Sequence, residues 1–117
     1  MRVSGRNNSD ERGAIMDKYN EDLLNVIFSI KKIPGIYLGT KSVTRLRSFL
    51  DGFSLGYNYP SMKPNFRDFQ ERMEAKYRVR ESIGWDMILL RQTNDETQAF
   101  DLFFEEFEEY LKENGIG

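Results

Sequence analysis

Apolar residues recur at three- and four-residue spacings along most of the chain, and this spacing constrains the fold more than any other sequence feature. A 3.6-residue repeat gathers apolar residues on one side of an α-helix, whereas a half-buried strand alternates every second residue. Of the 117 residues, 39% are hydrophobic and 14% are aromatic, which is enough to fill one modest core. We therefore predict an all-α fold, a single-domain bundle of four or five helices.

The predicted helices cover residues 15–33, 42–57, 66–77, 82–91 and 93–114. The last has the widest apolar face: Ala99, Phe100, Phe103, Phe104, Phe107, Tyr110 and Leu111. Segment 82–91 is ambiguous between a short buried helix and a strand, and we interpret it as a helix because no second strand candidate could pair with it. Ser42 is a suitable N-cap for the second helix. Thr93 and Glu96 match a capping box, in which each side chain binds a backbone N–H at the start of the last helix.

A structural turn is predicted at Pro34, Gly35 and Gly39, where proline and glycine interrupt the helical pattern. In this interpretation the glycines supply positive φ, and Ile36, Tyr37 and Leu38 enter the core. The turn also resembles the R-P-G-M-Y-I-G segment of the gyrase B-type ATPases. Those sites need a D-x-G-x-G strand at a spacing that this chain does not have, and the chain is too short for that fold. We therefore predict that ATP does not bind.

The sequence contains neither cysteine nor histidine. This excludes a disulfide framework, a thiolate nucleophile and a cysteine-ligated zinc site. It also removes the usual general base near neutral pH and the commonest metal ligand. The acids Glu105, Glu108 and Glu109 could be considered as metal ligands, but adjacent helix positions point apart. We therefore expect a protein that is not an enzyme, with no catalytic residues, no metal and no cofactor.

The two ends of the chain differ in character. Residues 1–13 are polar and lack an apolar signal-peptide core, so they are interpreted as a flexible leader or an expression remnant, with residues 14–117 as the helical domain. No apolar run approaches the ~18 residues that a membrane span needs, so we expect no membrane contact and a cytoplasmic location. Residues 95–117 hold eight acids and one base, whereas the first 94 residues hold 16 bases and 11 acids.

The acids of the last helix are predicted on the exposed side, away from the apolar face: Asp101, Glu105, Glu106, Glu108, Glu109 and Glu113. They have two interpretations. Glu105 lies four residues from both Asp101 and Glu109, and such like-charge pairs each cost roughly 0.2–0.5 kcal/mol. Anions near a helix C-terminus also interact unfavourably with the helix dipole, by about 0.3–1 kcal/mol each. Fold stability alone is therefore not expected to favour this pattern. One interpretation is a solvated face that keeps the protein soluble; the other is a docking surface for a basic partner, formed by Asp101, Glu105, Glu108 and Glu109.

A resemblance covers about residues 20–111. Its elements are a K/R-x-P-G-x-Y-L-G turn at Lys32–Gly39, an S-x-x-x-L-x-x-F-L-x-G helix at Ser42–Gly52, a central aromatic helix, a tryptophan followed by aliphatic residues, and a final A-F-D-x-F-F helix beginning at Ala99. This arrangement resembles small toxin-immunity proteins of bacterial polymorphic and contact-dependent growth inhibition systems. Ile33 departs from it, because such turns often have arginine at that position.

The resemblance implies a cytoplasmic protein that binds and neutralises a cognate bacterial toxin, often a nuclease, by stoichiometric occlusion. The expected partner is a protein toxin with a basic surface. The toxin-binding residues would be the four acids above, with exposed aromatics such as Tyr57, Tyr59 or Tyr37 as anchors. The alternative is a small regulatory or adaptor protein that binds nucleic acid through the basic first 94 residues. The bases of the third predicted helix are interleaved with acids, however, so nucleic acid is not the expected partner.

Overall fold

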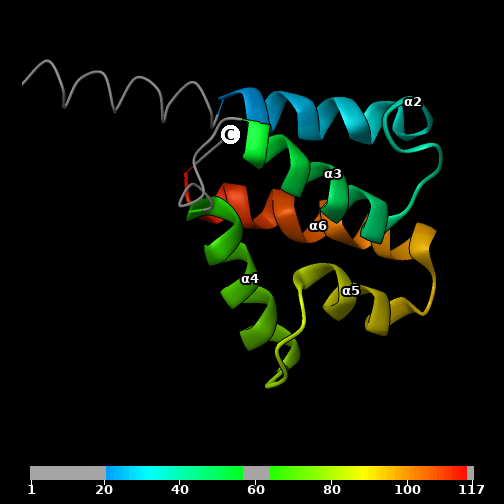
Figure 1. The fold of residues 1–117 in the computed structure, drawn as a ribbon. Helices are drawn as coiled ribbons and strands as arrows, with labels where there is room; N and C mark the ends of the chain where they lie inside the picture. The colour runs from blue at the N-terminus through cyan, green and yellow to red at the C-terminus, as the bar shows by residue number, and fades with distance from the viewer. Residues whose placement is uncertain (1–20, 57–63, 116–117) are drawn as a thin grey trace, which may run out of the picture.

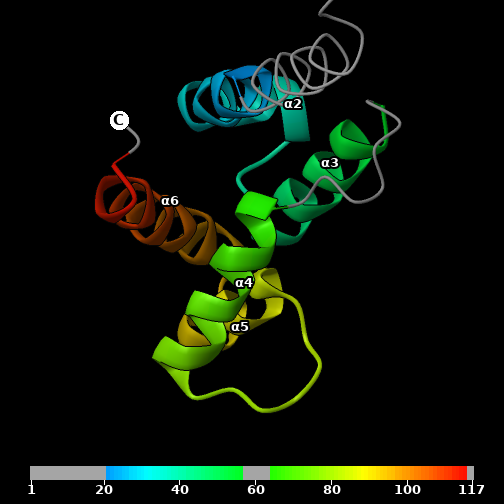
Figure 2. The same cartoon turned by 90° about the vertical axis from the view of Figure 1, so that its left-hand side faces the viewer.

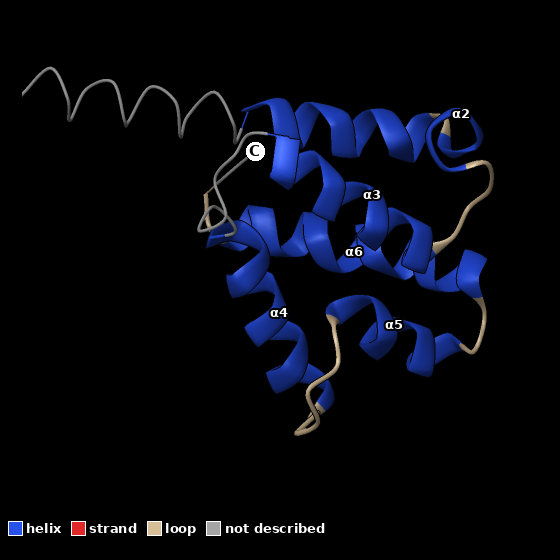
Figure 3. Cartoon of the chain, viewed as in Figure 1, coloured by secondary structure: helices blue, strands red, loops and turns tan. Residues whose placement is uncertain are grey.

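The computed structural model describes residues 21–56 and 64–115, and within those ranges every regular element is a helix (Figure 3). An N-terminal helix occupies residues 21–32 and is followed by α2 (Pro34–Leu38), α3 (Val43–Gly56), α4 (Pro64–Tyr77), α5 (Trp85–Thr93) and α6 (Glu96–Glu113). The all-α prediction is confirmed. The ambiguous segment is helical from Trp85, so the helix interpretation was right there too. The number of helices was underestimated, because the described residues form six.

The additional helix is α2, a single turn where a loop was expected. Proline is favoured in the first turn of a helix because its φ is already helical and no N–H is needed there. Gly39 ends α2 in the left-handed region, with φ of 82°, and its N–H donates to the carbonyl of Gly35 at 2.9 Å. Gly35 itself lies within the helix and has no positive φ. Of the three residues expected in the core, only Leu38 is buried, whereas Ile36 and Tyr37 are exposed.

Helix α6 lies at the centre of the fold. Figures 1 and 2 show the N-terminal helix on one side of it and α4 and α5 on the other. All seven residues of its predicted apolar face are buried. The Phe69 ring of α4 meets five other rings at centroid distances of 5.5–6.4 Å, those of Phe66, Trp85, Phe103, Phe107 and Tyr110. Aromatic pairs of this kind each stabilise a core by about 0.5–1.5 kcal/mol beyond the area that they bury.

The helix starts are capped differently from the predicted scheme. Ser42 caps α3 as expected, with its hydroxyl accepting from the N–H of Arg45 at 3.1 Å. The capping box was wrong: Thr93 is the last residue of α5, and Asp95 caps α6 by accepting from the N–H of Gln98 at 2.8 Å. Glu96 does not reach back along its own helix. Its carboxylate instead accepts hydrogen bonds from Ser42 and Thr44 at the start of α3.

Two groups of residues singled out in the sequence, the leader 1–13 and the tyrosines Tyr57 and Tyr59, lie outside the described residues. Within the described ranges, none of the helices combines the length and hydropathy required to cross a bilayer.

Candidate functional site

Three of the four acids predicted to bind a partner line a groove between α6 and the N-terminal helix. One part of the groove is a hollow of about 330 Å³ lined by Lys31, Lys41, Phe100, Asp101, Phe104, Glu105 and Glu108. A hollow of about 860 Å³ continues it and is lined by Leu24, Phe28, Lys31, Glu108, Leu111, Lys112 and Gly115. The two hollows share Lys31 and Glu108. We call this continuous surface, with its aromatic floor and charged rims, the α6 groove.

Ion pairs cross the α6 groove at its exposed rim. Lys31 pairs with Glu108, and Lys41 Nζ lies 3.0 Å from Asp101 Oδ1. Each lysine also sits over a floor ring, at 5.6 Å from the Phe104 centroid for Lys31 and 5.8 Å from the Phe100 centroid for Lys41. Solvent-exposed pairs contribute only about 0–1 kcal/mol each, because water and salt screen them. A charged partner can therefore displace these contacts at small cost.

Glu105 lies between the two paired acids along the rim. It is exposed, and no described lysine or arginine lies within ion-pair distance of it. Asp101, Glu105 and Glu108 follow one another at spacings of four and three residues, so they form a row about 10 Å long on one side of α6. The structure therefore brings three of the predicted acids together, and Glu105 is the one whose charge has no local counterion among the described residues.

The fourth predicted acid, Glu109, faces the other side of α6. Its carboxylate lies 3.2 Å from Arg72 Nη2 on α4, and the same guanidinium binds Glu113. The hydrogen bond to Glu113 is the main cause of a raised pKa for Arg72, and it lowers the pKa of the Glu113 carboxyl in turn. Glu109 thus takes part in the contact between α4 and α6, and it does not share a surface with the other three.

Glu106 was expected on the exposed side of the last helix, and that expectation was wrong. Its residue exposure is 3%, and its carboxylate lies 2.7 Å from Lys76 Nζ and accepts a 2.5 Å hydrogen bond from the Tyr77 hydroxyl. Burial, reinforced by the neighbouring carboxylate, raises the pKa of Tyr77, so the phenol stays protonated at neutral pH. Position 106 lies three residues after Phe103 and four before Tyr110, a spacing that could have revealed it as an inward position.

The α4 bases do not form a separate basic face. Arg72 and Lys76 bind α6 carboxylates, and Arg67 lies 4.0 Å from Glu71 on its own helix. In the part of the chain that the structure describes, no three acidic side chains approach closely enough to hold a metal ion.

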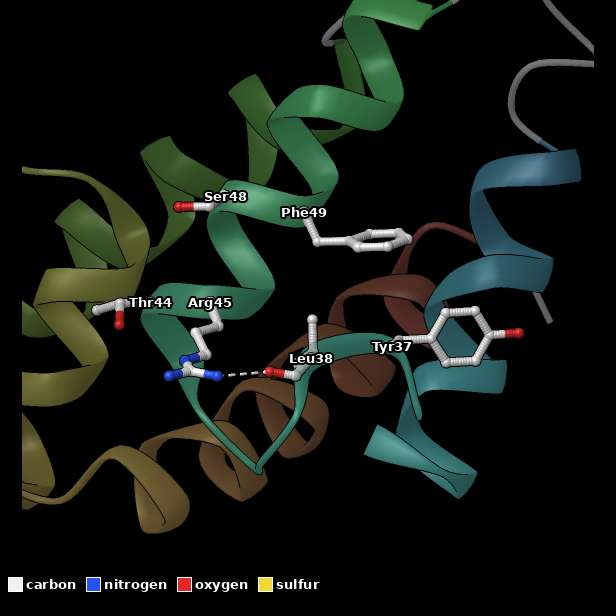
Figure 4. Close-up of a pocket in the computed structure, with 6 residues that line it drawn as sticks. All are labelled: Tyr37, Leu38, Thr44, Arg45, Ser48 and Phe49. Carbon is white, nitrogen blue, oxygen red and sulfur yellow. Dashed lines mark hydrogen bonds between the residues drawn. The ribbon is translucent and has the colours of Figure 1, made fainter. Parts of the chain in front are cut away.

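A second surface lies where α2 meets α3 (Figure 4). A shallow hollow of about 330 Å³ there is lined by Tyr37, Leu38, Thr44, Arg45, Ser48 and Phe49. The Arg45 guanidinium donates to the carbonyl of Leu38 at 2.8 Å, and the rings of Tyr37 and Phe49 meet edge to face at 5.9 Å. These contacts hold α2 against the first turns of α3 and fix the guanidinium at the rim of the hollow.

Comparison with protein-family models, curated protein sequences and solved structures found no significant match to this chain. The residues and their arrangement are therefore the basis for inferring the function.

Proposed function

We propose that this chain is an immunity protein that binds a cognate bacterial toxin and blocks it by stoichiometric occlusion, without catalysing a reaction itself. The supporting observation is the row of Asp101, Glu105 and Glu108 along the rim of the α6 groove, in which Glu105 has no cation partner among the described residues. A nuclease cleft is lined with basic side chains that bind phosphates. A rigid helix that presents carboxylates one turn apart offers such a cleft a competing set of anions.

The lysines of the groove are compatible with this role. Lys31 and Lys41 are each about half exposed and bind their acids at the surface, where an ion pair exchanges partners readily. A basic toxin surface would displace the lysines from Glu108 and Asp101 and expose the Phe100 and Phe104 rings beneath them. The contact would then combine charge at its rim with apolar area at its centre, as protein interfaces generally do.

A protection assay tests this function with a matched control. The chain is co-expressed in a bacterial host, which places it in the cytoplasm where we propose it acts, with the toxin domain of a secreted-toxin gene adjacent to its own. The absence of such a neighbouring gene would count against the immunity function. The groove variant carries Asp101→Asn, Glu105→Gln and Glu108→Gln, and the control carries Glu21→Gln, Glu71→Gln and Glu81→Gln, three exposed acids on other elements. Both variants lose three charges. We expect the control to protect cells as the wild type does and the groove variant to lose protection.

Association kinetics give a second readout. The groove variant should associate with the toxin domain at least about tenfold more slowly and with a weaker dependence on salt, because steering acts mainly on the association rate. A groove variant that protects fully would remove the acidic row from the mechanism. A wild-type chain that binds no toxin domain but binds generic DNA in a salt-dependent way would contradict the immunity function and favour the nucleic-acid alternative.

A further inference from the structure

The segment from residue 23 to residue 50 contains no acid and five bases, Lys31, Lys32, Lys41, Arg45 and Arg47. It forms most of the N-terminal helix, all of α2 and the first half of α3. Lys31 and Lys41 bind α6 carboxylates, and Arg47 binds Asp51 and Asp86. Lys32 and Arg45 form no ion pair within the described ranges, so the positive charge of this segment is uncompensated around α2.

An apolar cluster lies within the same segment. Ile33 immediately precedes α2, and Ile36 and Tyr37 lie within it; the exposures of the three residues are 46%, 77% and 36%. Leu38 points inward and is buried, so α2 is anchored by one face while presenting the other to solvent. We call these three side chains, together with the neighbouring bases Lys32 and Arg45, the α2 corner.

Local contacts fix the conformation of the α2 corner. Pro34 fixes the start of α2, Gly39 ends it, and the Arg45 bond to the Leu38 carbonyl ties it to α3. The edge-to-face contact between Tyr37 and Phe49 orients the tyrosine ring at the edge of the adjoining hollow (Figure 4). The Glu96 carboxylate also lies near the start of α3, but it accepts hydrogen bonds from Ser42 and Thr44 and forms no ion pair with Lys32 or Arg45. The corner therefore offers rigid apolar contacts edged by positive charge.

We propose that the α2 corner is a second contact for the toxin, and that it fits an apolar patch edged by carboxylates. This inference rests on the proposed function and adds the chemistry of a second part of the partner's surface. Two observations support it. The corner is opposite in charge to the acidic row, and Lys31 and Lys41 flank α2 in sequence while lining the α6 groove, so the two surfaces adjoin.

Interface size also favours a two-part contact. A stable protein interface buries about 800 Å² on each partner, more than one rim of an 18-residue helix can provide. Binding energy in such interfaces is concentrated in a few anchoring side chains surrounded by a polar rim. Ile36 and Tyr37 are suited to be those anchors, whereas the acidic row acts mainly on the rate of encounter.

The test compares two exposed apolar residues on the same protein. Ile36→Ser removes the most exposed side chain of the corner, and Leu55→Ser removes a side chain that is 70% exposed near the far end of α3. Both variants should melt within about 2 °C of the wild type, because neither residue contributes to the core. Against the toxin domain, we expect Ile36→Ser to raise the Kd at least about tenfold through faster dissociation, and Leu55→Ser to change it less than about twofold.

The positive rim is tested by Lys32→Glu, with Arg80→Glu as the control at an exposed base on the connection between α4 and α5. Lys32→Glu should weaken binding several-fold more than the control, since it places a carboxylate opposite those of the partner. Equal effects of the two charge reversals would show that only net charge matters and would overturn the complementarity assigned to the corner.

The outcomes separate this inference from the proposed function. If the wild type does not bind the toxin domain, the proposed function fails and the inference fails with it. If the wild type binds and Ile36→Ser binds equally well, only the inference fails. Co-sedimentation of the wild type with vesicles of phosphatidylcholine and phosphatidylglycerol, lost in Ile36→Ser while toxin affinity is unchanged, would also overturn it, because the corner would then be a lipid contact.

Discussion

The Glu96 carboxylate, at the first residue of α6, accepts hydrogen bonds from both the backbone N–H and the hydroxyl of Thr44, at 3.1 Å and 2.9 Å. Ser42 donates to the same carboxylate at 2.8 Å. An acid from one helix thus satisfies the free donors and the positive dipole end of another helix that precedes it by about 50 residues. This contact fixes the start of α3 against the start of α6.

We predict that Glu96→Gln lowers the free energy of unfolding by about 1–2 kcal/mol at pH 7, as expected for hydrogen bonds to a charged group. Burial opposes ionisation of this carboxyl, but the hydrogen bonds from Thr44, Ser42 and Val43 outweigh burial and lower its pKa from the ordinary value of a glutamate. A lowered pKa stabilises the folded state above the unfolded pKa, and this stabilisation is lost as the pH falls through the folded pKa. Urea unfolding from pH 7 to pH 3 should therefore show the gap between wild type and variant closing on acidification.

Glu105→Gln is the control for that experiment. Glu105 is on the same helix but exposed and without an ion pair to any described residue, so its change should stay within about 0.5 kcal/mol. If the difference in free energy of unfolding between wild type and Glu96→Gln is constant across the pH range, the carboxylate charge does not contribute to capping.

Much of this fold could be predicted from helical spacing alone, because the apolar stripe that a helix buries is visible as a local pattern in the sequence. Phe100 and Phe103 were predicted on the apolar face of the last helix, and both are fully buried. The roles of Glu96 and Glu106 could not be predicted in the same way, since their partners lie on other helices, 52 and 30 residues away. In an isolated helix, the acids of α6 would be destabilising. Among the residues that the structure describes, four cations on other segments bind acids of that helix: Lys31, Lys41, Arg72 and Lys76.

The α2 corner shows a second limit of sequence reasoning. Proline and glycine at positions 34 and 35 indicated an interruption of the helix, and residue 33 does separate two helices. The direction in which Ile36 and Tyr37 point depends on whether the following residues form a turn of helix, and a single turn has too few residues for periodicity to reveal it. Apolar character alone suggested burial, whereas the structure leaves both side chains at the surface.

The buried acid of α6 gives a second prediction. Lys76→Met should lower the free energy of unfolding by about 1–3 kcal/mol, because the buried Glu106 carboxylate would keep only the Tyr77 hydroxyl. Tyr77→Phe should cost about 1–2 kcal/mol through the loss of one hydrogen bond to a charged group. Restoring stability in the Lys76→Met background by Glu106→Leu would show that the cost arises from the unpaired charge. If Lys76→Met is as stable as the wild type, the ion pair contributes nothing to the contact between α4 and α6.

The two glycines of the α2 segment should respond differently to alanine. Gly39 has a φ of 82°, and a Cβ there would lie 3.0 Å from Arg45 Nη1, so Gly39→Ala should destabilise the fold by about 1–2 kcal/mol. Gly35 has no positive φ, and a Cβ at that position would meet open space, so Gly35→Ala should be neutral or stabilising by up to about 1 kcal/mol. Thermal melts of the two variants side by side provide the measurement. Equal destabilisation would mean that the left-handed cap at Gly39 is not the reason for glycine there.

The last prediction concerns the stability of a variant with Asp101, Glu105, Glu108 and Glu109 all changed to Gln. The change removes exposed ion pairs to Lys31, Lys41 and Arg72, each of which contributes about 0–1 kcal/mol. It also removes like-charge repulsion within α6, which costs roughly 0.2–0.5 kcal/mol per pair. Because the two effects oppose each other, we expect the free energy of unfolding to change by less than about 2 kcal/mol.

Salt separates the two contributions. Raising NaCl from about 50 mM to about 0.5 M shortens the screening length to a few ångströms and weakens both attraction and repulsion between exposed charges. If the interhelix pairs dominate, the wild type loses stability with added salt and the quadruple variant loses less. If repulsion within α6 dominates, the wild type gains stability with salt and the variant is the more stable protein at low salt. We expect the first result, because Asp101, Glu108 and Glu109 each have a cation within ion-pair distance and only Glu105 has none among the described residues. The second result would mean that the acids oppose the fold, and that their charge is maintained for something other than stability.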